Sequence, residues 1–162
     1  MKLIRLLMVV AALFAAAGCQ NSPPLRGGLT EAQIAVLERV GFGQTGDTWS
    51  LDLDGRLLFE TDNAALTHQT RDIIERVALA LKSVDIDRLT VEGHADNTGD
   101  ARYNRELSLR RAASVARAFT AYGIPYDHIV VRGRGSERPI ADNATAEGRA
   151  QNRRVVLIVP AG

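Results

Sequence analysis

The chain has 162 residues, and its 20 basic side chains nearly balance its 19 acidic ones, which gives a formal net charge of +1. This balance excludes the strongly basic face with which nucleic-acid-binding proteins hold phosphates. The chain has a single cysteine, so it contains no internal disulfide. Its length suits one domain with a single core.

The first residues have the composition of a cleaved targeting signal. Lys2 and Arg5 are followed by twelve consecutive apolar residues at 6–17, and this stretch is too short to span a bilayer. We therefore predict a signal peptide over residues 1–18. Its removal lowers the 20 basic side chains to 18, against 19 acidic ones.

The sequence AAGC ends at Cys19 and resembles a bacterial lipobox, with Ala16 in place of the usual Leu. The resemblance implies acyl chains on Cys19, which anchor a protein stably without a spanning helix. Gln20, rather than Asp, resembles an outer-membrane sorting signal of Gram-negative bacteria. An ordinary secretory signal with an incidental cysteine is the alternative. Residues 19–28 would then form a lipidated tether that reaches at most about 30 Å.

Residues 29–56 are predicted to form a helix followed by a strand. A Thr and a Gln at capping-box spacing begin the helix, and apolar residues recur at helical spacing until Gly41. Alternating apolar residues at 49–53 indicate a strand. Asp54-Gly55 is typical of a tight turn, which would return the chain as a hairpin over residues 57–59.

The rest of the chain alternates helices with strands. This alternation predicts an α/β sandwich, in which a mixed sheet of about four strands carries helices on one side, with the N-terminal helix and hairpin added. On the longer helix, Leu109, Ala112, Ala113, Ala116 and Phe119 are spaced to face the core. The expected helices are at about 67–82 and 102–122, and the expected strands are near 89–91, 129–131 and 153–159.

Five short motifs follow one another in the second half of the chain. Their order and spacing resemble the OmpA-like C-terminal domain, a peptidoglycan-binding module, over roughly residues 57–159. Ala95 stands where that family usually has Thr, and Glu60 stands where many members have Asp. The motifs are GHAD at 93–96, NTG at 97–99, YN at 103–104, LSLRRA at 107–112 and NRR at 152–154.

The resemblance implies a site for the diaminopimelate side chain of the wall stem peptide, which ends in an ammonium and a carboxylate. Asp96 would hold the ammonium, and the planar fork of Arg111 would hold the carboxylate. Asn104, Leu107 and Arg111 share a helix face that would form one wall of a groove. Solvated surface charges, worth at most about 1 kcal/mol as a pair, are the alternative. The resemblance adds Glu60, Thr98 and Arg153 to the site.

The sequence offers no catalytic constellation. His94 and Asp96 have no third ligand at a spacing typical of a metal site. Ser108 has no histidine placed to activate it. We therefore expect a protein that is not an enzyme and that needs neither a metal nor another cofactor; a wall hydrolase is the least supported class.

A second resemblance extends beyond the binding domain, to the YfiB-type outer-membrane lipoproteins. These proteins bind peptidoglycan and capture the periplasmic inhibitor YfiR, which releases an inner-membrane diguanylate cyclase and raises cyclic-di-GMP. The resemblance implies a signalling adaptor with a YfiR-like partner, whereas a purely structural Pal-like tether is the alternative. It rests on residues 29–42, 48–51 and 83–94.

The same resemblance gives the segment at 29–56 a partner-binding role, ahead of a peptidoglycan-binding domain at 57–162. Leu37, Phe42 and Trp49 occupy the positions expected of a latch, which holds the first helix down until a partner binds. The alternative is that these three apolar residues only attach the helix to the sheet.

Overall fold

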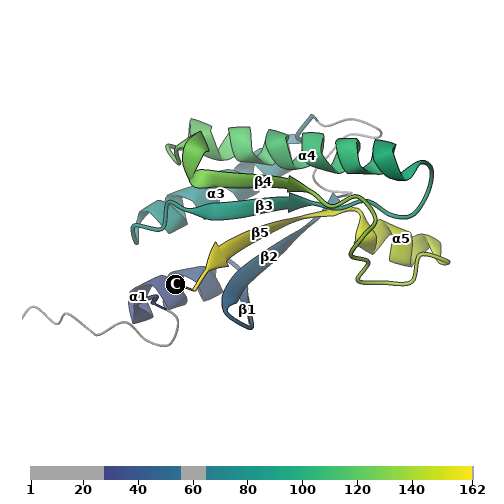
Figure 1. Ribbon diagram of the computed structural model, residues 1–162. Coiled ribbons are helices and arrows are strands. Elements are labelled where there is room, and N and C mark those ends of the chain that lie inside the picture. The colour runs from purple at the N-terminus through teal and green to yellow at the C-terminus, as the bar shows by residue number, and fades with distance from the viewer. Residues whose placement is uncertain (1–27, 56–64, 162) are drawn as a thin grey trace, which may run out of the picture.

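The computed structural model describes residues 28–55 and 65–161, in which helices pack on a mixed sheet (Figure 1). The signal peptide, Cys19, most of the tether and Glu60 lie outside the described residues. The helices are α1 (Glu31–Arg39), α3 (His68–Lys82), α4 (Ala101–Ala121) and α5 (Ala146–Asn152), with a 3-10 turn at Tyr126–His128. The strands are β1 (Gly43–Thr45), β2 (Thr48–Asp54), β3 (Leu89–Gly93), β4 (Ile129–Gly133) and β5 (Arg154–Pro160).

The sheet has five strands in the order β1-β2-β5-β3-β4. β3 and β4 are parallel, and α4 forms most of the connection that such a pair requires. The other neighbours are antiparallel. The predicted α/β sandwich with a mixed sheet is confirmed, with five strands where about four were expected.

The core lies on one face of the sheet, because alternate residues of each strand point to the same side. On β5, Val155, Leu157 and Val159 are at most 1% exposed and pack with residues of α1, α3 and α4. Full burial of such side chains contributes about 1.5–3 kcal/mol each. The opposite face carries Glu92 of β3 and Arg154 of β5, and no helix among the described residues contributes to a core there.

Helix α4 lies along β3 and β4 (Figure 1). Asp100 caps its first turn by accepting a hydrogen bond of 2.9 Å from the Tyr103 amide, and Gly123, with φ +88°, follows its end as predicted. The predicted apolar stripe is wrong at Leu109, which is 45% exposed. Leu109 lies beside Gly133 on the edge strand β4, where no further strand covers it.

The N-terminal capping box is confirmed, because Thr30 and Gln33 exchange hydrogen bonds of 2.9 and 3.3 Å. The observed hairpin differs from the predicted one. Its strands are β1 and β2, and Gly46, with φ +59°, forms the turn between them. The polar, exposed strand β1 shows no alternation from which it could be predicted. The expected return strand at 57–59 lies outside the described residues.

Helix α5 is not among the helices that the sequence predicts. Thr145 caps it by accepting a hydrogen bond of 3.0 Å from the Gly148 amide. A glycine within a short helix disfavours helix formation. Here it is required, because a Cβ on Gly148 would lie 2.0 Å from the Asp142 carbonyl oxygen. The glycine that allows this close contact with the Asp142 loop also lowers the helix propensity of the segment, so sequence patterns do not predict α5.

Candidate binding site

Asp96 lies in the loop that leaves the end of β3. Its side chain is 10% exposed, so its carboxylate can still be reached from solvent. Oδ1 accepts a hydrogen bond of 2.8 Å from the Thr98 amide, and Oδ2 accepts one of 2.6 Å from Arg153 Nη1. A carboxylate offers about four lone-pair positions, so both oxygens keep acceptor capacity for a further cation.

The surroundings of Asp96 keep it ionised. Burial alone would raise its pKa, but the hydrogen bonds from Arg153 and Thr98 outweigh burial and hold the pKa below its ordinary value. The carboxylate therefore carries its negative charge throughout the physiological pH range. It is suited to hold an ammonium group.

Asn104 fastens this loop to α4. Its amide donates hydrogen bonds of 3.2 Å to the Asp96 carbonyl oxygen and 2.8 Å to the Thr98 carbonyl oxygen. Leu107 and Arg111 follow Asn104 on the same helix face, and both are partly exposed. Arg111 lies roughly 10 Å further along the helix axis, since each residue rises about 1.5 Å.

Of the residues predicted for the site, four are joined by direct contacts: Asp96, Thr98, Asn104 and Arg153. Arg111 shares the helix face of Asn104. Ala95, where the family usually has Thr, is 7% exposed, and its amide donates to the Gly135 carbonyl oxygen at 2.8 Å. Arg153 contacts Asp96, whereas the next residue, Arg154, pairs with Asp52. Glu60 lies outside the described residues.

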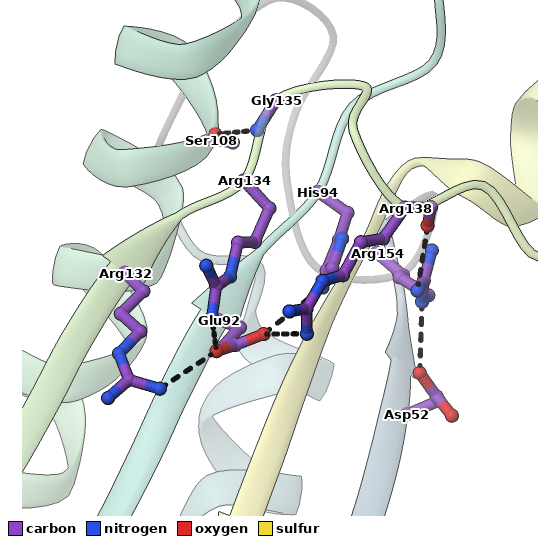
Figure 2. A network of polar contacts seen from close by, with 9 residues as sticks. All are labelled: Asp52, Glu92, His94, Ser108, Arg132, Arg134, Gly135, Arg138 and Arg154. Carbon is purple, nitrogen blue, oxygen red and sulfur yellow. Dashed lines mark hydrogen bonds and ion pairs between the residues drawn. The ribbon is translucent and has the colours of Figure 1, made fainter.

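A second polar cluster was not predicted. Arg132, Arg134 and Arg138 surround the Glu92 carboxylate on the opposite face of the sheet, as Figure 2 shows. The alternation of the strand predicts the position of Glu92. Because Val91 faces the core, Glu92, the next residue, must lie on the opposite face of the sheet. Sequence alone did not reveal that arginines from a distant strand and loop would meet it.

Asn152, in the NRR motif, also has a role that was not predicted. Its side-chain oxygen accepts hydrogen bonds of 2.8 and 3.1 Å from the Ile140 and Ala141 amides. Its amide group donates to the Ala141 carbonyl oxygen at 2.9 Å and to Asn143 Oδ1 at 2.8 Å. Asn152 is 1% exposed, so it organises the loop before α5 rather than binding a ligand.

The sequence profile of the OmpA family matches residues 58–153. The chain belongs to the OmpA family. Outer-membrane lipoprotein YfiB of Pseudomonas aeruginosa is 46% identical over 145 residues, 90% of this chain and 86% of that protein. The peptidoglycan-binding protein ArfA of Mycobacterium bovis is 39% identical over 137 residues, 85% of this chain and 38% of that protein.

The fold comparison agrees with the family. The solved structure of the cell wall anchor of the T6SS from Pseudomonas aeruginosa is similar, with a TM-score of 0.67 and 34% identity. The match covers 81% of this chain and 94% of that one. The predicted resemblance to the OmpA-like domain and to YfiB-type lipoproteins is thus confirmed.

Within this OmpA-family chain, the three predicted latch residues are core residues. Leu37, Phe42 and Trp49 are 0%, 4% and 5% exposed and belong to one hydrophobic cluster. The Phe42 amide donates to the Leu37 carbonyl oxygen at 2.9 Å, which closes the end of α1. Such contacts are expected of simple packing and of a closed latch alike.

Among residues 28–55 and 65–161, no three His, Cys, Asp or Glu side chains are grouped so that they could bind a metal ion. No helix in the same residues has the length and apolarity needed to cross a bilayer. His94 is 3% exposed; its backbone amide donates to the Arg154 carbonyl oxygen at 2.9 Å, and its buried Nδ1 has no hydrogen-bond partner among the described residues.

Proposed function

We propose that this chain binds peptidoglycan non-covalently through the diaminopimelate side chain of the stem peptide. Asp96 receives the ammonium group and Arg111 the carboxylate, with Asn104, Leu107, Thr98, Glu60 and Arg153 around them. The observation that carries the proposal is the Asp96 carboxylate, which stays ionised, is 10% exposed, and lies in a loop whose backbone Asn104 fixes to α4. The naming of ArfA as a peptidoglycan-binding protein supports it.

Arg153 has a positioning role in this proposal. Its guanidinium already pairs with Asp96 Oδ2 at 2.6 Å and fixes one rotamer of that carboxylate. A fixed carboxylate loses little conformational freedom when the ligand binds. Arg111, further along the same face of α4, is then the guanidinium that takes the ligand carboxylate in a bidentate contact.

We further propose that the protein is a lipid-anchored component of the outer membrane, attached through Cys19 and facing the periplasm. The name of its Pseudomonas aeruginosa relative, an outer-membrane lipoprotein, supports this location. The segment at 29–56 then acts as a signalling adaptor that sequesters a periplasmic YfiR-like inhibitor of a diguanylate cyclase. Leu37, Phe42 and Trp49 would form its latch.

Replacing Arg111 with Ala tests the binding site. We expect co-sedimentation with purified sacculi to weaken by about tenfold or more, because a charge-assisted contact contributes about 1.5–3 kcal/mol. Arg110→Ala is the matched control, since Arg110 is the exposed neighbour on the same helix and its loss changes the net charge equally.

Circular dichroism of both variants checks that they remain folded. Equal retention of Arg111→Ala and Arg110→Ala by sacculi would exclude Arg111 from the site. Competition by free diaminopimelate, seen with the wild type and lost in the Arg111 variant, would identify the ligand group.

A further inference from the structure

On the face of the sheet opposite the helices, arginine side chains gather around Glu92 at one end of the strands. Glu92 and Val156, neighbours on β3 and β5, are 3% and 8% exposed although neither belongs to the helix-covered core. Arginine stems can cover apolar surface while their charged ends stay in water. Figure 2 shows these side chains gathered over the ends of the strands.

This arginine patch consists of Arg132, Arg134, Arg138 and Arg154, arranged around Glu92. Glu92 Oε1 accepts hydrogen bonds of 3.2 Å from Arg132 Nη1 and 2.6 Å from Arg134 Nη2. Arg138 Nη1 approaches Glu92 Oε2 at 3.9 Å, which is an ion pair without a hydrogen bond. The Glu92 side chain is 4% exposed and therefore forms a buried anchor for the patch.

Positive charge exceeds negative charge in the patch. Its four guanidinium groups face two carboxylates, those of Glu92 and of Asp52, which pairs with Arg154 Nε at 3.1 Å. Among the described residues, positive charges exceed negative ones by two within these six side chains; Glu137, which also acts on Arg134, pairs with Arg105. Arg132 and Arg138 hold this excess where a ligand can reach it, because their side chains are 50% and 63% exposed.

Several donors in the patch have no acceptor among the described residues. Arg154, which is 8% exposed, has a buried Nη1 without a hydrogen-bond partner, and so has Arg134 at its Nε. The exposed Arg138 guanidinium donates no hydrogen bond to a described residue. The two buried donors are out of reach of a ligand, so the groups that can offer hydrogen bonds to an anion are the exposed guanidinium groups of Arg132 and Arg138.

We propose that the arginine patch is a binding site for a phosphate group. Its guanidinium groups come from β4, from the loop after β4 and from β5, and Arg132 and Arg138 extend beyond their contacts with Glu92 into solvent. The excess positive charge of about two matches a phosphate monoester, which carries about −1.5 to −2 at neutral pH. The guanidinium fork pairs with two phosphate oxygens at once.

The site is separate from the one that Asp96 forms. Arg153 and Arg154 are consecutive, and their side chains contact Asp96 and Asp52 on opposite sides of the sheet. Substitutions that abolish phosphate binding should therefore leave peptidoglycan binding unchanged, and substitutions at the Asp96 site should leave phosphate binding unchanged. A loss of one with retention of the other shows which of the two proposals is wrong.

Thermal unfolding in rising concentrations of inorganic phosphate tests the proposal, with sodium chloride used to hold the ionic strength constant. We expect a saturable rise in Tm for the wild type, because a ligand that binds only the folded state stabilises it. The double variant Arg132→Ala/Arg138→Ala should bind phosphate at least about tenfold more weakly, since charge-assisted contacts are lost.

The two replaced side chains are half exposed or more, so the double variant should fold. Arg110→Ala, outside the patch, should keep the wild-type response. A Tm that rises no more in phosphate than in chloride would overturn the proposal, and so would an equal loss in Arg110→Ala. The wild type and the double variant should be retained equally by sacculi.

Vesicles containing phosphatidic acid, whose headgroup is a phosphate monoester, compared with phosphatidylcholine vesicles, distinguish two sources of the phosphate. Retention of the wild type but not of the double variant on the anionic vesicles would support the site and assign it to a lipid headgroup. Saturable stabilisation by free phosphate without vesicle retention would support the site and assign it to a soluble phosphate.

Discussion

At the end of the sheet near Asp96, consecutive residues contact groups on opposite faces of the sheet. Arg153 pairs with Asp96, while Arg154, the next residue, pairs with Asp52. His94 lies on the Glu92 side, with Nε2 4.0 Å from Oε2, whereas Asp96 follows in the loop after β3, which ends at Gly93. The alternation of an extended chain thus brings two charged clusters into the same few residues without merging them.

His94 gives this region a pH dependence. Burial, reinforced by the positive charge of Arg154, lowers its pKa to about 4. In the unfolded chain a histidine titrates near about 6.5, so between these values the unfolded state binds a proton that the folded state does not. Stability should therefore fall as the pH falls through this window, by on the order of 3 kcal/mol in total.

Urea unfolding from about pH 7 to about pH 5 measures this effect, which should be much smaller in His94→Gln. His68→Gln, at an exposed histidine, should behave as the wild type does. Asp96 and Glu92 have lowered pKa values, so their contributions are lost only at more acidic pH. An unchanged pH dependence in His94→Gln would refute the assignment.

At the scale of elements, the position of the site depends on how closely α4 approaches β3. A Cβ placed on Gly93 would lie 2.0 Å from the Ser108 carbonyl oxygen, which belongs to the backbone of α4. Ser108 reinforces the contact by accepting a hydrogen bond of 2.9 Å from the Gly135 amide. The helix that carries Asn104 and Arg111 is thus held directly against the strand that leads to Asp96.

Gly93→Ala should destabilise the protein by about 3 kcal/mol or more, because the clash is with backbone and cannot be relieved by a rotamer change. Gly43→Ala is the control, since nothing lies within 4 Å of its added Cβ, and its effect should stay within about 0.5 kcal/mol. Urea unfolding of both variants provides the measurement. Equal free energies of unfolding for Gly93→Ala and Gly43→Ala would show that α4 shifts to accommodate the added methyl group without loss of stability.

At the scale of the whole molecule, α1 and the Asp96 end of the sheet lie far apart, with α1 near the C-terminus and α5 at the other end (Figure 1). One sheet nevertheless joins them, since β2 pairs with β5 along its whole length from Thr48 to Asp54. Deleting residues 29–50 would therefore expose an edge of β5. A point substitution in α1 is the sharper test of the partner-binding segment.

Leu37→Pro should loosen α1, because Pro inside a helix costs about 3 kcal/mol, and should strengthen capture of a YfiR-like inhibitor by up to about 100-fold. Pull-down with the purified inhibitor measures capture. Glu38→Ala, at the exposed neighbour, is the control. Capture no stronger than that of the wild type would count against the latch, and wall binding should not change.

The sequence by itself determined much of the fold. Apolar periodicity predicted α1, α3, α4 and the strands β2 to β5, because burial on one face imposes a repeat that the chain must show. It did not predict β1, which is exposed and polar, or α5, whose glycine is explained only by a neighbouring loop. Tertiary contacts stabilise β1 and α5, and such contacts do not produce a periodic apolar pattern in the sequence.

The same division applies to the sites. Asp96, Asn104 and Arg153 could be named from motifs, because each motif fixes its residue types within a short stretch. The grouping of Glu92 with Arg132, Arg134 and Arg138 was decided by the parallel pairing of β3 with β4 and by the loop that follows. About 40 residues separate these charges in the chain, and electrostatic contact depends on distance in space, which only the folded sheet sets.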